Sequence, residues 1–456
     1  MSEEVTLDEF TGSSDSDESR KRLESRFWGE IPEGWELVNG SEVYEVNPNP
    51  KSDEEPNTYI EMDALDTELP YPQYFGERNA SEYSGKTFTE GDTLFARITP
   101  CTENGKAALV PEMDTEVGIG STEYAVLSPK TNRINPWLLY YLSKSHPVHN
   151  YAVSRMRGST GRQRVPFSVF RRELDVALPP LSEQRKIATV LYTVDQAIEK
   201  TEEIIEQSWK AKKGLVQTLL TEGVYGHTEY EQYRLGPIDL TKPEDWELKS
   251  FEEFSFRVQD GPHITPDYVD EGIPFVSSQN INPFRGEFDY SQYEKYVSEE
   301  TYKEINQNCR PEKGDLIISR RATIGPTQLI RHNGQFGFFV GVAIIKTDDT
   351  IHNPFLEQLM NWSVMEKLWH LKSPGSTMKT LNLGTIKEQK IPLPPMQEQK
   401  EIAKILQTQD DKIVNNERYK ETLQRLKRGL MQDLLSGTVR TTDTNIEVPE
   451  EIAQYG

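Results

Sequence analysis

The stretch ALPPLSEQRKIATVLYTVDQAIEK occupies residues 177–200, and a similar stretch, PLPPMQEQKEIAKILQTQDDKIVN, occupies residues 392–415. The two lie 215 positions apart, and 19 of the 43 positions in residues 178–220 are identical in residues 393–435 without a gap. An internal match at one fixed offset indicates a duplicated structural unit. The match therefore predicts a pseudo-two-fold internal repeat in which each copy ends in the same element.

Each copy of the repeated stretch has the pattern of one long helix. Apolar residues recur in steps of three and four, which is the spacing of one helix face. Paired prolines block an earlier start, and Gly223 and Gly437 suit a stop. About 40 residues at ~1.5 Å each would form a rod of ~60 Å.

The apolar face of the first helix is interrupted by Thr201, Ser208 and Lys212, so neither helix is expected to be stable alone. We expect the two helices to pack antiparallel on each other, although two unrelated surface helices would have a similar pattern. The residues expected at the contact are Ile187, Leu191, Val194, Ile198, Leu215, Leu219, Ile402, Leu406, Ile413, Leu423, Leu430 and Leu434.

Shorter matches extend the duplication into the region before each helix. IPEGWELV (31–38) resembles KPEDWELK (242–249), and GDTLFAR (91–97) resembles GDLIISR (314–320). Short alternating runs favour mixed α/β modules with antiparallel strands, each followed by a helix near 136–143 or 354–370. The predicted fold is α+β, with two tandem α/β domains separated and joined by two long antiparallel coiled-coil helices. The expected segments are an acidic disordered tail (1–28), a first domain (29–177), a first long helix (178–226), a second domain (227–392), a second long helix (393–437) and a C-terminal tail (438–456).

Composition limits the class of protein. The chain of 456 residues has 51 Lys and Arg against 74 Asp and Glu, a net charge of -23. An excess of acidic residues argues against a nucleic-acid partner unless Lys and Arg are concentrated in one place. A halophile-like acidic surface is the alternative explanation of the excess. The two cysteines, the lack of an 18-residue apolar run and the acidic N-terminus predict a soluble protein of the cytoplasm.

Acidic residues are missing from two windows at matching places in the repeat. Residues 151–172 contain six arginines around Gly-Ser-Thr, and residues 367–387 contain four lysines around the same tripeptide, with no Asp or Glu in either. Arginine forks suit phosphate oxygens and guanine edges, so we expect DNA to bind here. A solvated basic patch or a binding site for an acidic neighbour is the alternative. The predicted DNA-binding residues are Arg97, Arg155, Arg157, Ser159, Thr160, Arg162, Arg164, Arg320, Arg321, Lys372, Ser376 and Lys379.

Catalytic motifs are not found in the sequence. No phosphate-binding G-x-x-x-x-G-K-[ST] loop, no Gly-rich cofactor turn and no Asn-Pro-Pro-Tyr-type motif for amino-methyl transfer is present. His146 and His149 form an H-x-x-H pair, but no Glu or Cys completes a metal site, so a hydrogen-bonded pair at a helix end is expected. No catalytic residue and no metal ligand is predicted.

Together these features resemble the specificity subunit of type I restriction–modification systems. The resemblance is carried by the signature L-P-P-L-x-E-Q-x-x-I-A-x-x-L at 178–191, repeated at 393–406, by the two divergent modules, and by the helix ends GLVQTLLTEG and GLMQDLLSG. It covers residues 31–440. The chain departs from the common pattern in its acidity and in its Ser/Asp/Glu-rich N-terminal tail.

The resemblance implies two target-recognition domains that each read one half of a split DNA sequence. It implies that the helices act as a ruler and as a binding site for methyltransferase (modification) subunits, and that a restriction/translocase subunit joins the complex. The expected partners are thus double-stranded DNA and these subunits, without a membrane. No cofactor is expected in this non-catalytic chain, since S-adenosylmethionine, ATP and magnesium would serve the partner subunits. The alternatives are a stand-alone DNA-modifying enzyme and a coiled-coil scaffold that binds no DNA.

Overall fold

The computed structural model describes residues 28–455, apart from 52–54, 80, 82, 264, 292, 308–309 and 374–378. Contacts divide the chain into two compact units: unit 1 is Met1–Glu202 with Tyr419–Gly456, and unit 2 is Glu203–Arg418. The division falls inside both long helices, so each unit contains one of the two repeated domains and part of each helix. Most of the expected N-terminal tail lies outside the described residues.

A short antiparallel strand pair joins the two ends of each domain. In unit 1, β1 (Glu36–Asn39) pairs with β10 (Asp175–Leu178), and in unit 2, β13 (Glu247–Ser250) pairs with β21 (Lys390–Leu393). The repeated W-E-L segments of the sequence form β1 and β13. Because β10 and β21 lead directly into the long helices, each domain is closed at the point where its helix begins.

Unit 1 contains two four-stranded sheets with strand orders β2-β9-β6-β7 and β4-β3-β8-β5. Pairing is antiparallel except between β3 and β8. Its other elements are β2 (Tyr44–Val46), β3 (Asn57–Ile60), β4 (Gly76–Arg78), β5 (Lys86–Phe88), β6 (Thr93–Ala96), β7 (Ala107–Leu109), β8 (Gly118–Gly120), β9 (Tyr124–Pro129), α2 (Gly40–Val43), α3 (Pro136–Lys144), α4 (His146–Ser154), the π-helix η3 (Val169–Glu173) and α12 (Glu450–Ala453).

Unit 2 repeats this plan with a four-stranded sheet, β14-β20-β17-β18, and a three-stranded sheet, β16-β15-β19. Strands β15 and β19 pair in parallel, as β3 and β8 do in unit 1. Its elements are β11 (Tyr230–Leu235), β12 (Ile238–Pro243), β14 (Ser255–Asp260), β15 (Ile273–Val276), β16 (Tyr296–Val297), β17 (Leu316–Ser319), β18 (Thr327–Leu329), β19 (Gly337–Phe338), β20 (Val342–Thr347), α6 (Phe251–Phe254), α7 (Glu299–Ile305), α8 (Asn353–Met360), α9 (Ser363–Leu371) and α10 (Leu383–Glu388).

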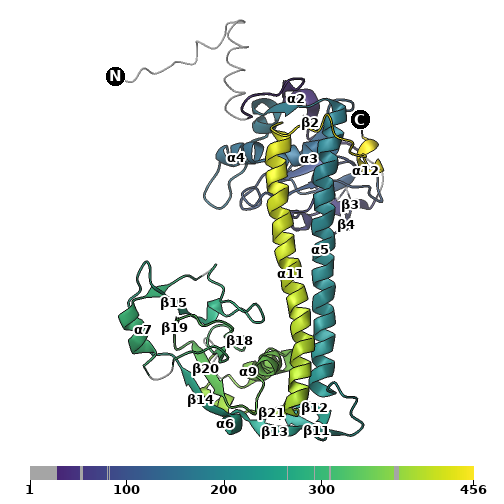
Figure 1. The fold of residues 1–456 in the computed structure, drawn as a ribbon. Coiled ribbons are helices and arrows are strands. Elements are labelled where there is room, and N and C mark those ends of the chain that lie inside the picture. Colours follow the sequence, from purple (N-terminus) through teal and green to yellow (C-terminus); the bar gives the residue numbers. More distant parts are fainter. Residues whose placement is uncertain are drawn as a thin grey trace, which may run out of the picture. The chain divides into compact units, whose positions relative to one another are not determined.

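The duplicated stretches form the long helices α5 (Leu181–Thr221) and α11 (Met396–Leu435), which pack together (Figure 1). Within unit 1 the start of α5 packs on the end of α11, because Ile198 shares a buried cluster with Leu423 and Leu430. Within unit 2 the end of α5 and the start of α11 contribute to one core, which contains Leu219 and Ile402. The helices are therefore antiparallel, and the predicted α+β fold with two joined domains is confirmed.

One detail differs from the expectation drawn from the sequence. The helix expected at 354–370 is two helices, α8 and α9, because the Asn361 side chain donates to the Glu357 carbonyl at 2.7 Å and ends α8. The C-terminal tail that follows α11 packs on the first domain. Ile452 is fully buried, and the Asn135 side chain donates to its carbonyl at 3.1 Å and to that of Tyr455 at 3.1 Å.

Candidate nucleic-acid interface

Within the acid-free window of the first domain, residues 157–164 form a hairpin loop that is closed by an isolated antiparallel β-bridge and has Gly-Ser-Thr at its tip. The backbones of Arg157 and Arg164 exchange two hydrogen bonds of 2.9 Å. Gly158 and Gly161 have φ values of 133° and 80°, which side chains larger than glycine rarely adopt. A Cβ on Gly158 would also lie 2.8 Å from the Arg162 carbonyl oxygen. The tight turn therefore requires glycine at both positions.

Arg97 and Arg164 hold this hairpin against the end of β6. The Val165 amide donates to the Arg97 carbonyl at 2.8 Å, and Arg97 Nε donates to the Val165 carbonyl at 2.9 Å. The Glu123 carboxylate accepts from Arg164 Nε at 2.9 Å and lies 3.5 Å from Arg97. The Arg164 hydrogen bond, opposed by partial burial, lowers the pKa of Glu123. Both arginines thus stabilise the hairpin in this conformation.

The other predicted residues of the window, Arg155, Arg157, Ser159, Thr160 and Arg162, are exposed. Arg155 contacts its own domain through a 2.7 Å hydrogen bond to the Tyr151 hydroxyl and a 3.3 Å ion pair with Glu173. Arg157 and Arg162 flank the tip of the hairpin. Their exposed guanidinium groups are of the kind that contacts phosphate and base edges.

Two cations that the sequence reading omitted lie beside this hairpin. The Phe167 ring lies 4.1 Å from the Arg97 guanidinium, 5.1 Å from the Lys86 ammonium and 5.8 Å from the Arg171 guanidinium. Arg171 belongs to the acid-free window, and its position there could have indicated it. Lys86 lies on β5, far away in the sequence, and only the fold brings it to the window.

Arg320 in the second domain repeats the role of Arg97. The Leu381 amide donates to its carbonyl at 2.9 Å, its Nε donates to the Leu381 carbonyl at 2.9 Å, and its guanidinium pairs with Asp260. Only 5% of Arg320 is exposed. Arg320, one of the predicted DNA-binding residues, is thus buried inside the domain, where it joins the basic window to the end of β17.

The other predicted DNA-binding residues of the second domain are Arg321, Lys372, Ser376 and Lys379. Arg321 is half-buried, and its backbone bridges to Thr380. Lys379 is exposed, whereas Lys372 is half-buried and donates to the Gln389 side chain at 2.6 Å. Ser376 lies outside the described residues.

The Glu-Gln pair of the repeated signature attaches the first helix to its domain. Glu183 accepts from the Trp35 indole at 3.0 Å and from the Arg440 guanidinium at 2.8 Å. The Gln184 side chain accepts a hydrogen bond of 2.8 Å from the backbone amide of Asn135, the residue that precedes α3. Glu183 and Gln184 are 2% and 1% exposed. The signature is therefore a buried joint between helix and domain.

The second copy builds the same joint with different neighbours. Glu398 accepts from the Trp246 indole at 3.0 Å and contacts His227 Nε2 at 2.9 Å, so a histidine stands where the first copy has Arg440. Gln399 accepts from the His352 amide at 2.8 Å.

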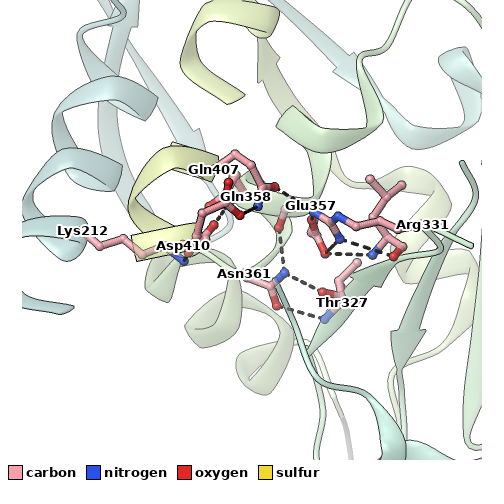
Figure 2. Close-up of polar contacts among 10 residues, drawn as sticks. Lys212, Thr327, Arg331, Glu357, Gln358, Asn361, Gln407 and Asp410 are labelled. Carbon is pink, nitrogen blue, oxygen red and sulfur yellow. Dashed lines mark hydrogen bonds and ion pairs between the residues drawn. The ribbon is translucent and has the colours of Figure 1, made fainter. Parts of the chain in front are cut away.

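A polar network around the buried carboxylate of Glu357 fixes α8 in unit 2 (Figure 2). Glu357 accepts from Arg331 NH2 at 2.5 Å and from the Leu329 amide at 2.9 Å. Arg331 also donates to the Gln407 side chain of α11 at 3.0 Å. Strand β18, helix α8 and helix α11 are thereby connected through one carboxylate.

The residues predicted at the helix contact occupy three environments. Ile187, Leu191 and Leu434 belong to the large core of the first domain, with Leu430 packed against it. Val194, Ile198, Leu423 and Leu430 form a smaller cluster with Leu69. In unit 2 the equivalent residues are Leu215, Leu219, Ile402 and Leu406. Ile413 is 1% exposed. Much of the apolar stripe therefore contacts the domains as well as the other helix.

Both histidines of the H-x-x-H pair form hydrogen bonds within the first domain. His149 contacts the Thr102 carbonyl at 2.7 Å, and His146 contacts the Asn150 side chain at 2.8 Å. Among the residues that the structure describes, no group of three potential ligands could hold a metal ion. In the same part of the chain, every helix is too short or too polar to cross a bilayer.

Comparison with known proteins identifies the family. The model of the type I restriction modification DNA specificity domain matches residues 32–207 and again residues 243–425, which together make up most of the chain. The chain belongs to the type I restriction–modification specificity subunits. The resemblance stated from the repeated signature is thus confirmed. As a specificity subunit, the chain is a non-catalytic component of a type I restriction–modification complex and serves in the recognition of target DNA.

Individual relatives agree with this assignment. The chain is 29% identical to the putative MjaX specificity subunit of Methanocaldococcus jannaschii over 90% of its own length and 95% of that protein. It is 32% identical to the EcoAI specificity subunit of Escherichia coli over 42% of its own length and 33% of that protein. The solved S subunit of M. genitalium has the same fold, with a TM-score of 0.54 and 13% identity over 89% of this chain and 97% of that one.

Proposed function

We propose that each recognition domain reads one half of a bipartite DNA target through its acid-free window. The observation that carries the proposal is the repeated attachment of that window. Val165 and Leu381 each form two hydrogen bonds with an arginine, Arg97 or Arg320, that follows a central strand. Two domains that differ in most of their residues keep this attachment, while the exposed groups beside it differ. Such a division suits a scaffold that presents different side chains to different bases.

The duplication supports the same proposal on grounds of symmetry. Two half-sites on a duplex are related by a two-fold rotation, and a protein reads them most simply when it has a matching pseudo-two-fold axis. A duplicated domain and helix provide this symmetry within one chain. Helices α5 and α11 would then set the separation of the half-sites and bind the methyltransferase subunits, with a restriction/translocase subunit completing the complex. S-adenosylmethionine, ATP and magnesium would act in those partners.

An exchange of domains tests this proposal. Residues 29–177 are replaced by the equivalent domain of a relative that has a different target, and the hybrid is assembled with the methyltransferase subunits. Methylation is mapped across a genome by single-molecule sequencing. One half-site should change while the other half-site and the spacer stay the same. Exchange of residues 227–392 is the matched control and should change the other half-site. A pattern in which either exchange alters both half-sites would contradict independent reading.

A further inference from the structure

In unit 1, a buried aspartate connects both long helices with the recognition domain. Asp195 on α5 accepts a hydrogen bond from the Tyr141 hydroxyl on α3 at 2.7 Å and lies 2.6 Å from the Lys427 ammonium on α11. Lys427 also donates to the Glu68 carbonyl at 2.5 Å. The side chains of Asp195 and Lys427 are 1% and 4% exposed. One ion pair therefore bonds two helices and two separate segments of the domain.

Unit 2 contains the same arrangement (Figure 2). Asp410 on α11 accepts from the Gln358 side chain on α8 at 2.5 Å and forms an ion pair with Lys212 on α5. The Lys212 ammonium also lies 3.2 Å from the centre of the Phe284 ring, in a loop of the second domain. Lys212, which interrupts the apolar stripe of the sequence, is thus a buried partner of the opposite helix.

The two ion pairs are copies of each other with the helices exchanged. Asp195 and Asp410 occupy the same position of the repeat, as do Lys212 and Lys427, since 195 + 215 = 410 and 212 + 215 = 427. Each helix therefore supplies the aspartate of one pair and the lysine of the other.

Such pairs act on specificity more than on stability. The cost of removing two charges from water offsets much of their attraction, so well-packed apolar residues could replace them with little loss of stability. A buried polar residue in a helix contact instead penalises every alignment that leaves it without a partner. If α11 slipped by one turn, about 5.4 Å, Leu423 or Met431 would face the Asp195 carboxylate in place of Lys427.

We propose that Asp195–Lys427 and Asp410–Lys212 are positioning pairs that fix the register of the two helices and of each domain along them. The consequence for DNA rests on the proposed function: a single register would fix the distance between the half-sites. The pairs contact no DNA in this proposal and act only through the placement of the domains.

Disulfide trapping in the full chain tests the register without DNA. Cys101 and Cys309 are changed to Ser, and cysteine replaces Glu202 together with either Lys420, its ion-pair partner, or Gln424, one turn further along α11. In the parent chain the 202–420 disulfide should dominate. In the apolar variant, which replaces both pairs (Asp195→Leu/Lys427→Leu with Lys212→Leu/Asp410→Leu), the 202–424 product should rise about tenfold, which corresponds to removal of a penalty of ~1.4 kcal/mol.

A second variant keeps the test decisive if the apolar one does not fold. Lys427→Leu/Met431→Lys, combined with Lys212→Leu/Asp410→Leu so that no second pair holds the original register, moves the lysine by one turn. Pairing with Asp195 then requires α11 to shift and bring position 424 opposite position 202. The 202–424 disulfide should then exceed the 202–420 disulfide. If both variants give only the 202–420 product, the ion pairs do not fix the register and the inference is wrong.

A DNA assay separates this inference from the proposed function. The parent and the apolar variant are assembled with the methyltransferase subunits and given duplexes whose half-sites lie one or two base pairs closer or further apart. Methylation of the altered spacers should rise about tenfold for the variant, which again corresponds to ~1.4 kcal/mol. A parent that recognises no bipartite duplex would refute the proposed function, while the disulfide experiment would still decide the role of the ion pairs.

Discussion

Neutralising the exposed arginines of the hairpin should change how DNA binding depends on salt. Arg157 and Arg162 flank the hairpin tip and are exposed, whereas Arg97 and Arg164 share the carboxylate of Glu123. Of these two pairs, only Arg157 and Arg162 can contact phosphates and displace counterions from a duplex without first breaking an ion pair within the protein. The variant Arg157→Gln/Arg162→Gln removes two charges and leaves the backbone hydrogen bonds of the hairpin in place.

The size of the effect follows from counterion release. Each phosphate contact contributes about 0.9 to the slope of log affinity against log salt, so the loss of two contacts should reduce that slope by about 1.8. When salt rises from 50 to 200 mM, the affinity of both proteins should fall. The factor by which it falls should be about twelve times smaller for the variant than for the parent. Fluorescence anisotropy of a labelled target duplex, titrated with the assembled complex at four salt concentrations, measures both quantities.

Two control variants make the result specific. Arg133→Gln removes an arginine of unit 1 that is 43% exposed, pairs with Glu36 and lies outside the acid-free window, so the slope should not change. Arg320→Gln removes a buried structural contact and should lower the stability of unit 2, with little change in slope for the fraction that remains folded. An unchanged slope in the Arg157/Arg162 variant, or an equal change in the Arg133 variant, would refute the assignment of the hairpin to phosphate contacts.

Three further predictions concern the helices and their joints. Leu191→Ala should lower the free energy of unfolding of unit 1 by ~2–5 kcal/mol in urea titrations, because its side chain is fully buried, whereas Leu426→Ala, at a leucine that is 50% exposed, should cost less than ~0.5 kcal/mol. Burial acts to raise the pKa of Glu183. Hydrogen bonds from the Arg440 and Trp35 side chains and from the Thr441 backbone amide outweigh burial and lower the pKa. The stability conferred by a lowered carboxyl pKa is present above the unfolded-state pKa and is lost as pH falls through the folded-state pKa. Arg440→Gln should therefore make unit 1 lose its structure at a higher pH, as measured by circular dichroism during acid titration. Insertion of four residues near the middle of α5 should lengthen the preferred spacer by ~5–6 Å, or one to two base pairs, and mapped methylation at the original spacing would contradict a ruler.

The architecture could be predicted from the sequence because the features that determine it are local and duplicated. The three-and-four spacing identifies each long helix, and Pro179-Pro180 limits where α5 can start. A second copy with the same period implies a partner for the first apolar face, which is enough to infer a packed pair. The prediction was less good for a helix break such as that at Asn361, because the side chain that ends α8 also bonds to the Thr327 carbonyl on a distant strand.

The interface was only partly predictable because composition locates charge without saying what the charge contacts. Arg157 was predicted from an acid-free window and Arg320 from its place at the end of a predicted strand, and neither position in the sequence tells whether the side chain is exposed. Arg320 is buried because the fold places Asp260 and the Leu381 carbonyl around its guanidinium. Lys86 was missed for the opposite reason, since its neighbours along the chain give no sign that β5 lies beside Phe167.

The positions at which the repeat stays identical show what the duplication preserves. Glu183, Gln184, Asp195 and Lys212 all recur at an offset of 215, and all four are buried polar residues that bond a helix to a domain or to the other helix. A buried polar group that loses its partner destabilises the protein more than a change in an apolar contact of similar size. Substitution at these joints is therefore strongly constrained, while side chains on the domain surface can change without disturbing the packing of the helices and their domains. A chain built this way can change the exposed side chains of one domain and keep the buried contacts that attach each helix to its domain.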